Sequence, residues 1–322
     1  MKQNMLNKKR GLKPGEIIPI FYDEAFRIMY ANPKHLEILT LLLSRILKVE
    51  YKDIEGKIEL EPLSIPNKTI GEKKTERDVV VSLKSSNKYK IILEVNVRKK
   101  FYQSIINRNI FYKNEVASGG IVEGENYNNM PITILVNFNT FYVDKVNKKV
   151  FDEYTLRNEE GNILTDREKV LNINIVKCKN LWYHNKYQGK FEPIEEDLML
   201  LCAAMVVDKQ EDFINILEEV RTRPEIKELM EGVLTDMVGD EEMYGRYYNW
   251  KEEQEKLNNS IIAEERDDAK KEGFEQGIQK TKREIVLKMY NDNLPIETIS
   301  NYTNLSLEEI KNIINTYKDI SN

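Results

Sequence analysis

The sequence holds few of the residues that several common chemistries need. Among 322 residues it has only two histidines, His35 and His184, and only two cysteines, Cys178 and Cys202. This scarcity argues against a disulfide framework, a zinc cluster and a histidine-based hydrolase. We expect the two cysteines to be ordinary reduced thiols.

Long apolar runs and known nucleotide-binding or nucleophile motifs are also missing. No segment approaches the roughly 20 apolar residues that a membrane-spanning helix needs. The basic start, MKQNMLNKKRGLKPG, is not followed by the apolar stretch of a secretion signal. Neither a phosphate-cradling glycine loop nor a serine in a nucleophile-elbow pattern is present. We therefore expect a cytoplasmic protein with no membrane partner.

Charge is unevenly distributed along the chain. The composition is 41% hydrophobic and 32% charged, which allows a folded core, and the net charge of -5 does not by itself indicate a nucleic-acid partner. Residues 68–113, however, contain twelve Lys or Arg against four acids, a net of +8. Such a basic zone suits a polyanion backbone, and a solvated basic face is the plainer alternative.

The first half of the chain predicts a mixed α/β arrangement. Residues 22–48 read as two helices with a break at Asn32-Pro33, because asparagine caps a helix and proline suits its first position. Strand-like runs follow around 57–65 and within 78–96, and then an amphipathic helix over 101–116 and a buried strand over 131–138. The order helix, three strands, helix, strand indicates an α/β or α+β core.

The second half is predicted to change from strands to helices. Residues 149–178 read as β-structure with a turn at 159–162, and its last strand, VLNINIVKC, alternates apolar and polar residues. From Glu195 onward the pattern is helical. The polar stretch 251–285 predicts an exposed helix or a linker, and as a helix it could pair two subunits; the tail predicts three short helices. We expect domains over 1–190, 191–258 and 259–322.

Two interpretations of the tail remain open. Pro295 begins its second predicted helix, and Ser306 with Glu309 forms a capping box for the third. The segment resembles a helix-turn-helix, which would read DNA. Its last helix is acidic at the start, however, which favours packing against protein.

Two acids are the strongest candidates for chemistry. A hairpin whose loop is Ser85-Ser86-Asn87 pairs residues whose numbers sum to 172, which places Asp78 opposite Glu94 and puts Asn96 on the same face. The opposite face then carries a coherent apolar set: Val79, Val81, Leu83, Tyr89, Ile91, Leu93 and Val95. Facing carboxylates repel, and a divalent cation would remove that cost. The alternative is a pair of strand-end acids matched with Lys or Arg.

These motifs, taken in order, resemble the PD-(D/E)XK nuclease superfamily, and more closely its recombination-promoting nucleases, also known as putative transposases. The resemblance rests on KKTERDVVVSL with YKIILEVN, on RNIFYKNEVASGG, on the opening helix pair, and on a tail that begins GFEQGIQKTKREIVLKMYND. It implies an α-β-β-β-α-β core over 1–190, followed by an all-α C-terminal region. It also implies a DNA substrate and a bound Mg²⁺, with Mn²⁺ as a substitute.

The resemblance assigns roles residue by residue. Asp78 and Glu94 become metal ligands, with the Val95 carbonyl as a third, and Asn96 stands where the superfamily usually has lysine. Asn96 could orient water, whereas the missing positive charge could come from a neighbour such as Lys73, Lys74 or Arg98. The residues expected to contact DNA are Lys73, Lys74, Arg77, Arg98, Lys99, Lys100, Arg108 and Tyr112.

Three hypotheses follow for the function. The first is a Mg²⁺-dependent DNA endonuclease in which Asp78, Glu94 and Asn96 form the catalytic set. The second is a catalytically weak or inactive DNA-binding protein on the same fold, which Asn96 favours. The third is an assembly protein that acts through its helical tail. In each case we expect a homo-oligomer formed through the C-terminal helices.

Overall fold

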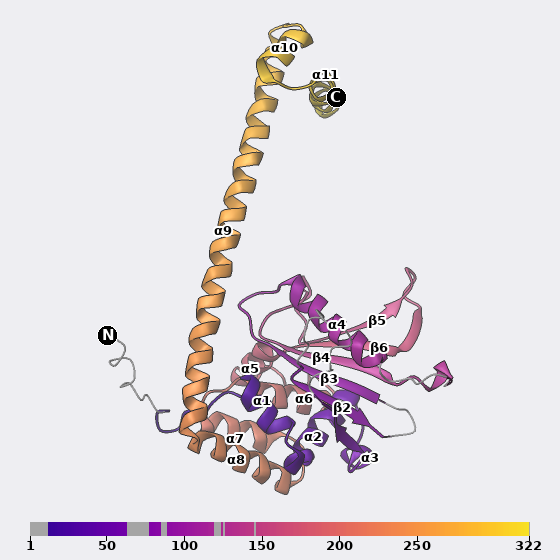
Figure 1. The fold of residues 1–322 in the computed structure, drawn as a ribbon, viewed down its shortest axis with the longest axis vertical. Helices are drawn as coiled ribbons and strands as arrows, with labels where there is room; N and C mark the ends of the chain where they lie inside the picture. Colours follow the sequence, from indigo (N-terminus) through magenta and orange to yellow (C-terminus); the bar gives the residue numbers. More distant parts are fainter. Residues whose placement is uncertain are drawn as a thin grey trace. The chain divides into compact units, whose positions relative to one another are not determined.

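The protein is described here from a computed structural model, which covers residues 12–62, 77–84, 89–118, 124, 126–144 and 146–321. The chain divides into two compact units, Met1–Glu252 and Glu253–Asn322. The first unit is a six-stranded mixed sheet with helices on both faces (Figure 1). Within the described part of the chain, no helix combines the length and apolar character that crossing a membrane would require.

The sheet has the order β1-β2-β3-β4-β6-β5. Strands β3, β4 and β6 run parallel at its centre, and the other neighbours pair antiparallel. The strands are β1 (Ile58–Leu60), β2 (Val79–Leu83), β3 (Tyr89–Asn96), β4 (Ile132–Asn139), β5 (Phe151–Arg157) and β6 (Ile163–Asn174). Because β3, β4 and β6 are parallel, their carboxyl ends meet at one edge of the sheet, where α/β proteins usually place their ligands.

The register between β2 and β3 is the predicted one. Val79 pairs with Leu93 and Val81 with Ile91, so the paired residue numbers sum to 172. The predicted apolar face is also confirmed, because Val79, Val81, Leu83, Ile91, Leu93 and Val95 all lie in the main core. The predicted loop residues 85–87 lie outside the described residues.

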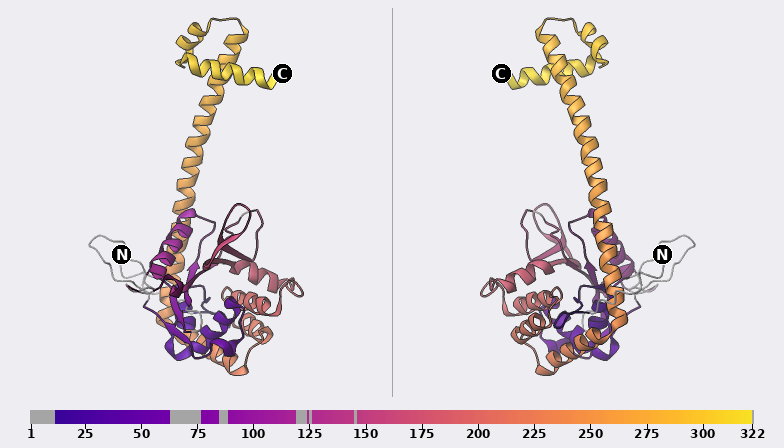
Figure 2. Two further views of the ribbon diagram at one scale, coloured as in Figure 1. Left: turned by 90° about the vertical axis from the view of Figure 1, so that its right-hand side faces the viewer. Right: turned by 90° about the vertical axis from the view of Figure 1, so that its left-hand side faces the viewer.

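One face of the sheet packs on a thick helical layer that forms the main core. Buried residues of the first two helices and of α6 to α8 all join this core. The helices of this layer are α1 (Asp23–Tyr30), α2 (Leu36–Leu47), α3 (Tyr51–Ile54), α5 (Ile175–Tyr183), α6 (Pro193–Ala204), α7 (Gln210–Glu219) and α8 (Pro224–Gly239). The predicted break falls between α1 and α2, where the Asn32 side chain accepts a hydrogen bond from the Lys34 N–H and caps the 3-10 turn Pro33–His35. Figure 2 shows the same layer from two sides.

The other face of the sheet is covered by α4 (Gln103–Ser118). A smaller apolar cluster of Val80, Ile92, Leu135 and Val116 fills the space between this helix and the sheet. Because side chains alternate along a strand, Glu94 and Asn96 share this face with Ile92. The fold therefore buries Glu94, one of the two predicted acids, under α4.

The predicted last strand, which extends to Cys178, is too long. Strand β6 stops at Asn174, and α5 begins at Ile175. The Asn174 side chain accepts a hydrogen bond from the Lys177 N–H at 2.8 Å and so caps this helix. The apolar residues after Asn174 are core residues of a helix, and a short apolar run cannot distinguish these two structures.

The second unit contains most of α9 (Glu241–Asn291), with α10 (Ile296–Thr303) and α11 (Leu307–Ser321). A small core of Val286, Ile299, Leu305, Ile310 and Ile314 joins them. The first of the three predicted tail helices is thus the end of α9. The predicted capping box is confirmed, because the Ser306 N–H donates to the Glu309 carboxylate at 2.7 Å and the Glu309 N–H donates to Ser306 Oγ at 3.2 Å.

Candidate functional site

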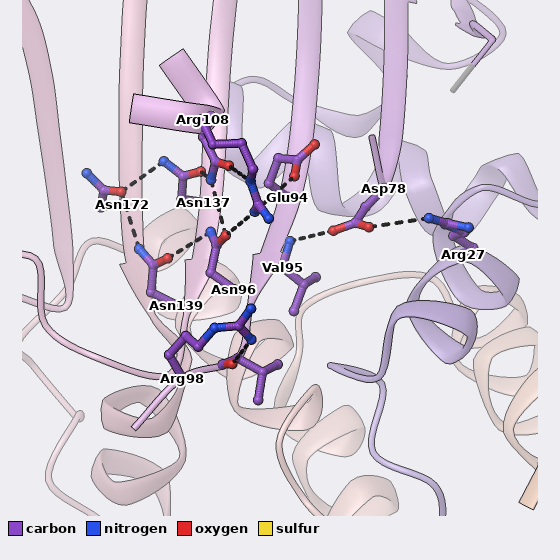
Figure 3. Close-up of polar contacts among 12 residues, drawn as sticks. Arg27, Asp78, Glu94, Val95, Asn96, Arg98, Arg108, Asn137, Asn139 and Asn172 are labelled. Carbon is purple, nitrogen blue, oxygen red and sulfur yellow. Dashed lines mark hydrogen bonds and ion pairs between the residues drawn. The ribbon is translucent and has the colours of Figure 1, made fainter. Parts of the chain in front are cut away.

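The two predicted acids lie on neighbouring strands at the edge where β2 begins and β3 ends (Figure 3). Asp78 directly precedes β2, and its Oδ2 accepts a hydrogen bond from the Val95 N–H at 2.8 Å. Its other oxygen is 3.6 Å from the Arg27 guanidinium on α1. Glu94 is only 3% exposed, and its Oε2 lies 3.9 Å from Arg108 Nη2 on α4.

Burial disfavours the ionised form of both carboxyl groups. Desolvation, followed by repulsion from Asp78, raises the pKa of Glu94 to about 8. Desolvation and then repulsion from Asp23 raise the pKa of Asp78 to about 6, although the Val95 N–H and Arg27 oppose the shift. Two acids that repel each other in a place poor in water favour a bound cation, because the cation would let both carboxylates ionise.

A third acid, Asp23, belongs to this site and was not predicted. It stands in the first turn of α1, and burial raises the pKa of its carboxyl against the opposing charges of Arg27, Arg98 and Arg108. Its charge in turn acts on Asp78. An acid in the first turn of a helix is common for reasons of helix electrostatics alone, so the sequence offered no sign of this role.

Asn96 lies at the end of β3, at the centre of a buried asparagine network. Its Oδ1 accepts hydrogen bonds from Arg108 Nη2 at 3.0 Å and from Asn109 Nδ2 at 3.2 Å. Its own Nδ2 donates to Asn139 Oδ1 at 3.0 Å. The network continues through Asn137 and ends on Asn172 Oδ1, which accepts from both Asn137 and Asn139 (Figure 3).

The sequence did carry a sign of this network. Asparagines recur at the ends of the central parallel strands, in EVN (94–96), VNFN (136–139) and LNIN (171–174). In the sheet, Glu94 pairs with Asn137 and Asn137 with Asn172, whereas Asn96 pairs with Asn139. Carboxyl ends of parallel strands gather their side chains at one edge, so these repeats marked the edge that holds the site.

The predicted DNA-contacting residues fall into different environments. Arg98 is half-buried, and its pKa is lowered by burial first and by the neighbouring charge of Arg108. Lys99 and Lys100 are exposed just after β3. Tyr112 lies beneath Arg108, whose guanidinium is 5.7 Å from the ring centre, as the four-residue spacing predicts. Lys73 and Lys74 lie outside the described residues.

Arg77 needs a correction. Its side chain is fully buried and its guanidinium pairs with Glu115 at 2.8 Å, so it is not placed to contact DNA at the surface. It also lies 5.5 Å from the Tyr112 ring centre. Arginine is rarely fully buried unless it is paired. The partner of Arg77, Glu115, lies 38 residues further along the chain, so the local sequence did not indicate this burial.

The donor set fits a hard divalent cation. Glu94 Oε1 is buried and has no hydrogen-bond partner among the residues that the structure describes, and a buried acceptor in that state is costly unless something satisfies it. Among the described residues, no three histidine, cysteine or acidic side chains converge into a ready metal cluster. A cation here would therefore rest on Asp78 and Glu94, with backbone carbonyls and waters completing the shell that Mg²⁺ prefers.

Comparison with known protein families identifies the family to which the chain belongs. The model of the PD-(D/E)XK nuclease family transposases matches residues 20–264, which is most of the chain. The chain belongs to this family. The match to the PD-(D/E)XK transposases spans the whole sheet, α4 and the helical layer, and it indicates a nuclease-type protein acting on DNA. No curated protein and no solved structure gives a significant match.

Proposed function

We propose that the protein is an endodeoxyribonuclease that depends on a divalent cation and hydrolyses phosphodiester bonds. One observation carries the proposal: the partly buried Asp78 and the buried Glu94 lie at one site, and Glu94 Oε1 has no hydrogen-bond partner among the described residues. Membership of the PD-(D/E)XK transposases supports the reaction class. Burial raises the pKa of both acids, so ionising either one without a bound cation costs folding stability.

In this proposal Asp78 and Glu94 hold the cation, with the Val95 carbonyl as a further ligand. The oxygen donors suit Mg²⁺, and Mn²⁺ could replace it. When bound, such an ion stabilises negative charge on phosphate oxygens and makes water a stronger nucleophile at neutral pH. The cation also removes the repulsion between the two carboxylates, so both can remain ionised.

The reaction is a hydrolysis at phosphorus. The oxygen of a water molecule forms a bond to the phosphorus, and the bond from phosphorus to one sugar oxygen breaks. The attacking water loses one proton, and the leaving oxygen gains one from solvent. The protein's contribution is to align the phosphate and to stabilise its added charge.

The residues that follow β3 are proposed to hold the DNA backbone. Arg98, Lys99 and Lys100 directly continue the strand that carries Glu94 and Asn96. Lys99 and Lys100 are exposed, and they can neutralise phosphates next to the one that is cut. Affinity should then fall steeply with salt, because each neutralised phosphate releases counterions.

Plasmid nicking tests the proposal. Purified wild type should nick supercoiled DNA in Mg²⁺ or Mn²⁺ and should stop when EDTA is added. Asp78→Asn and Glu94→Gln keep the shape of each side chain and remove its charge, and each should abolish nicking. Glu159→Gln, in the exposed turn after β5, is the matched control and should nick like wild type. Equal nicking by all four proteins would refute the assignment.

A second function has a specific observation in its favour. Asn96 stands at the position where the superfamily usually has lysine, and it carries no charge. Its amide is engaged in the buried network. The alternative is a DNA-binding protein whose site no longer cleaves. Calorimetry with Mn²⁺ separates the two, since a decayed site should release no binding heat that depends on Asp78.

We also propose that α9 pairs two copies of the chain. Phe274, Ile278 and Ile285 are exposed at spacings that bring them to one face of this helix, and Phe274 is 71% exposed. Residues 252–268 carry seven acids and two bases, whereas residues 269–288 carry six bases and three acids. Antiparallel pairing would set each acidic half beside the basic half of the other copy.

Light scattering on the full chain tests this pairing. Wild type should have the mass of a dimer, and Phe274→Glu should shift it toward the monomer. Tyr302→Glu changes an equally exposed aromatic residue on α10 and is the control. A monomeric wild type, or a Phe274→Glu variant that stays dimeric, would contradict the proposal.

A further inference from the structure

In the part of the chain that the structure describes, the ion pairs of Asp78 and Glu94 are with arginines and not with lysine, and several arginines lie around the acid pair. Arg77 is fully buried and paired with Glu115, and Arg27 pairs with Asp78 from the α1 side. Arg98 donates through Nη1 to the Val97 carbonyl oxygen. Arg108 differs from these, because its guanidinium reaches both Glu94 and Asn96 while its side chain is 40% exposed. It is the arginine best placed to meet a ligand at Glu94.

The hydrogen bonds of Asn96 show what this residue does. An amide oxygen has two acceptor positions, and those of Asn96 are taken by Arg108 and Asn109. Its nitrogen donates to Asn139, and Asn109 also donates to Asn137 Oδ1 at 2.7 Å. The network thus fixes which way the Asn96 amide points and aims its oxygen at Arg108. With both acceptor positions taken, Asn96 is poorly suited to accept a hydrogen bond from an attacking water molecule.

Tyr112 supports the same guanidinium from within α4. It lies one helical turn after Arg108, and its ring faces the Arg108 guanidinium at 5.7 Å from the ring centre. The buried Arg77 contacts the ring too, at 5.5 Å. An arginine held over an aromatic ring and hydrogen-bonded at its tip loses little further freedom when it binds a phosphate.

We propose that Arg108 is the catalytic cation of this site, and that Asn96 and Tyr112 are positioning residues that aim it. The inference rests on the proposed nuclease function. During hydrolysis Arg108 donates hydrogen bonds to the phosphate oxygens that gain charge. The positive charge therefore comes from α4 rather than from β3.

Four variants test this assignment by rescue. Arg108→Gln should lower the single-turnover cleavage rate about 10²-fold or more, as loss of a charge-stabilising donor does in other enzymes. Asn96→Lys alone should also cleave more slowly, because it breaks the network and sets a second cation against Arg108. In the double variant Asn96→Lys with Arg108→Gln, the lysine should restore part of the lost rate. Arg157→Gln, on the exposed β5–β6 hairpin, should cleave like wild type.

Two measurements distinguish the loss of a catalytic group from misfolding of the site. DNA affinity without metal, from fluorescence anisotropy, should weaken less than about tenfold in Arg108→Gln, as expected for one phosphate contact among several. Mn²⁺ affinity, from calorimetry, should hold or increase, because a positive charge near Glu94 has been removed. A misfolded site would lose Mn²⁺ affinity instead.

The outcomes distinguish this inference from the proposed function. If Arg108→Gln cleaves like wild type while Glu94→Gln does not, the role of Arg108 is refuted and the nuclease stands. A loss of cleavage that merely matches the loss of DNA affinity makes Arg108 a binding residue only and also refutes the inference. So does a double variant that shows no rescue. If wild type itself does not cleave, both proposals fail.

Discussion

Glu94 should make the metal-free protein less stable as the pH rises. Its pKa in the folded protein is raised from 4.5 to about 8, by burial first and by Asp78 second. Below pH 4.5 the carboxyl is protonated in the folded and unfolded chains alike, so its stabilising effect is fully present. Between these values the folded protein keeps the proton and the unfolded chain does not, so unfolding becomes easier with each step in pH.

The size of the effect follows from the shift. Each pH unit inside the window lowers the free energy of unfolding by about 1.4 kcal/mol, so the full window is worth a few kcal/mol. Glu94→Gln removes the titrating group with little change in shape. The variant should therefore match wild type near pH 4.5 and become the more stable protein toward pH 8.

Urea unfolding in EDTA at several pH values measures this difference. Wild type and Glu94→Gln are compared at each pH, with Glu159→Gln as a control whose difference from wild type should not change with pH. Adding Mg²⁺ at pH 8 should stabilise wild type and leave Glu94→Gln unchanged, because a ligand stabilises only the state that binds it. A stability difference that is independent of pH would refute the claim that Glu94 is buried at a charge cost.

Three further predictions concern the surroundings of the site and the tail. Asn137→Ala removes one of two hydrogen-bond partners from the buried amide nitrogen of Asn109 and from the buried amide oxygen of Asn172, and should cost about 1–3 kcal/mol in urea unfolding, whereas the exposed Asn128→Ala should cost almost nothing; equal stabilities would contradict the network. Tyr112→Leu should cleave several-fold more slowly than Tyr112→Phe, which keeps the ring under Arg108, and identical rates would show that the ring does not support the guanidinium. Ser306→Ala should lose about 1 kcal/mol of capping and speed amide exchange in the first turn of α11, with the α10 amides as internal control; unchanged exchange would speak against the cap.

Local patterns in the sequence were sufficient for the framework of the site. A slip of one residue between β2 and β3 would break up their apolar face, and the register that the short loop predicted keeps this face coherent and brings Asp78 beside Glu94. The spacing of Arg108 and Tyr112 likewise placed both on one face of α4. These features depend on residues close in sequence, where periodicity is a direct guide.

Other parts of the site depend on contacts between distant segments. Asp23 comes from the first helix, and its role becomes visible only when α1 meets the start of β2. Arg77 looked like a surface cation because its partner Glu115 lies on α4. Arg108 was predicted to contact DNA, whereas the missing positive charge was expected from a neighbour such as Lys73, Lys74 or Arg98; the structure brings Arg108 to within 3.9 Å of Glu94.

The most direct test of the account is to locate the cation itself. A crystal of the wild-type protein soaked in Mn²⁺ should give an anomalous difference peak in contact with the carboxylates of both Asp78 and Glu94, and a Glu94→Gln crystal treated in the same way should lose it. A peak elsewhere, or the same peak in both crystals, would contradict the proposal that these two acids hold the catalytic ion.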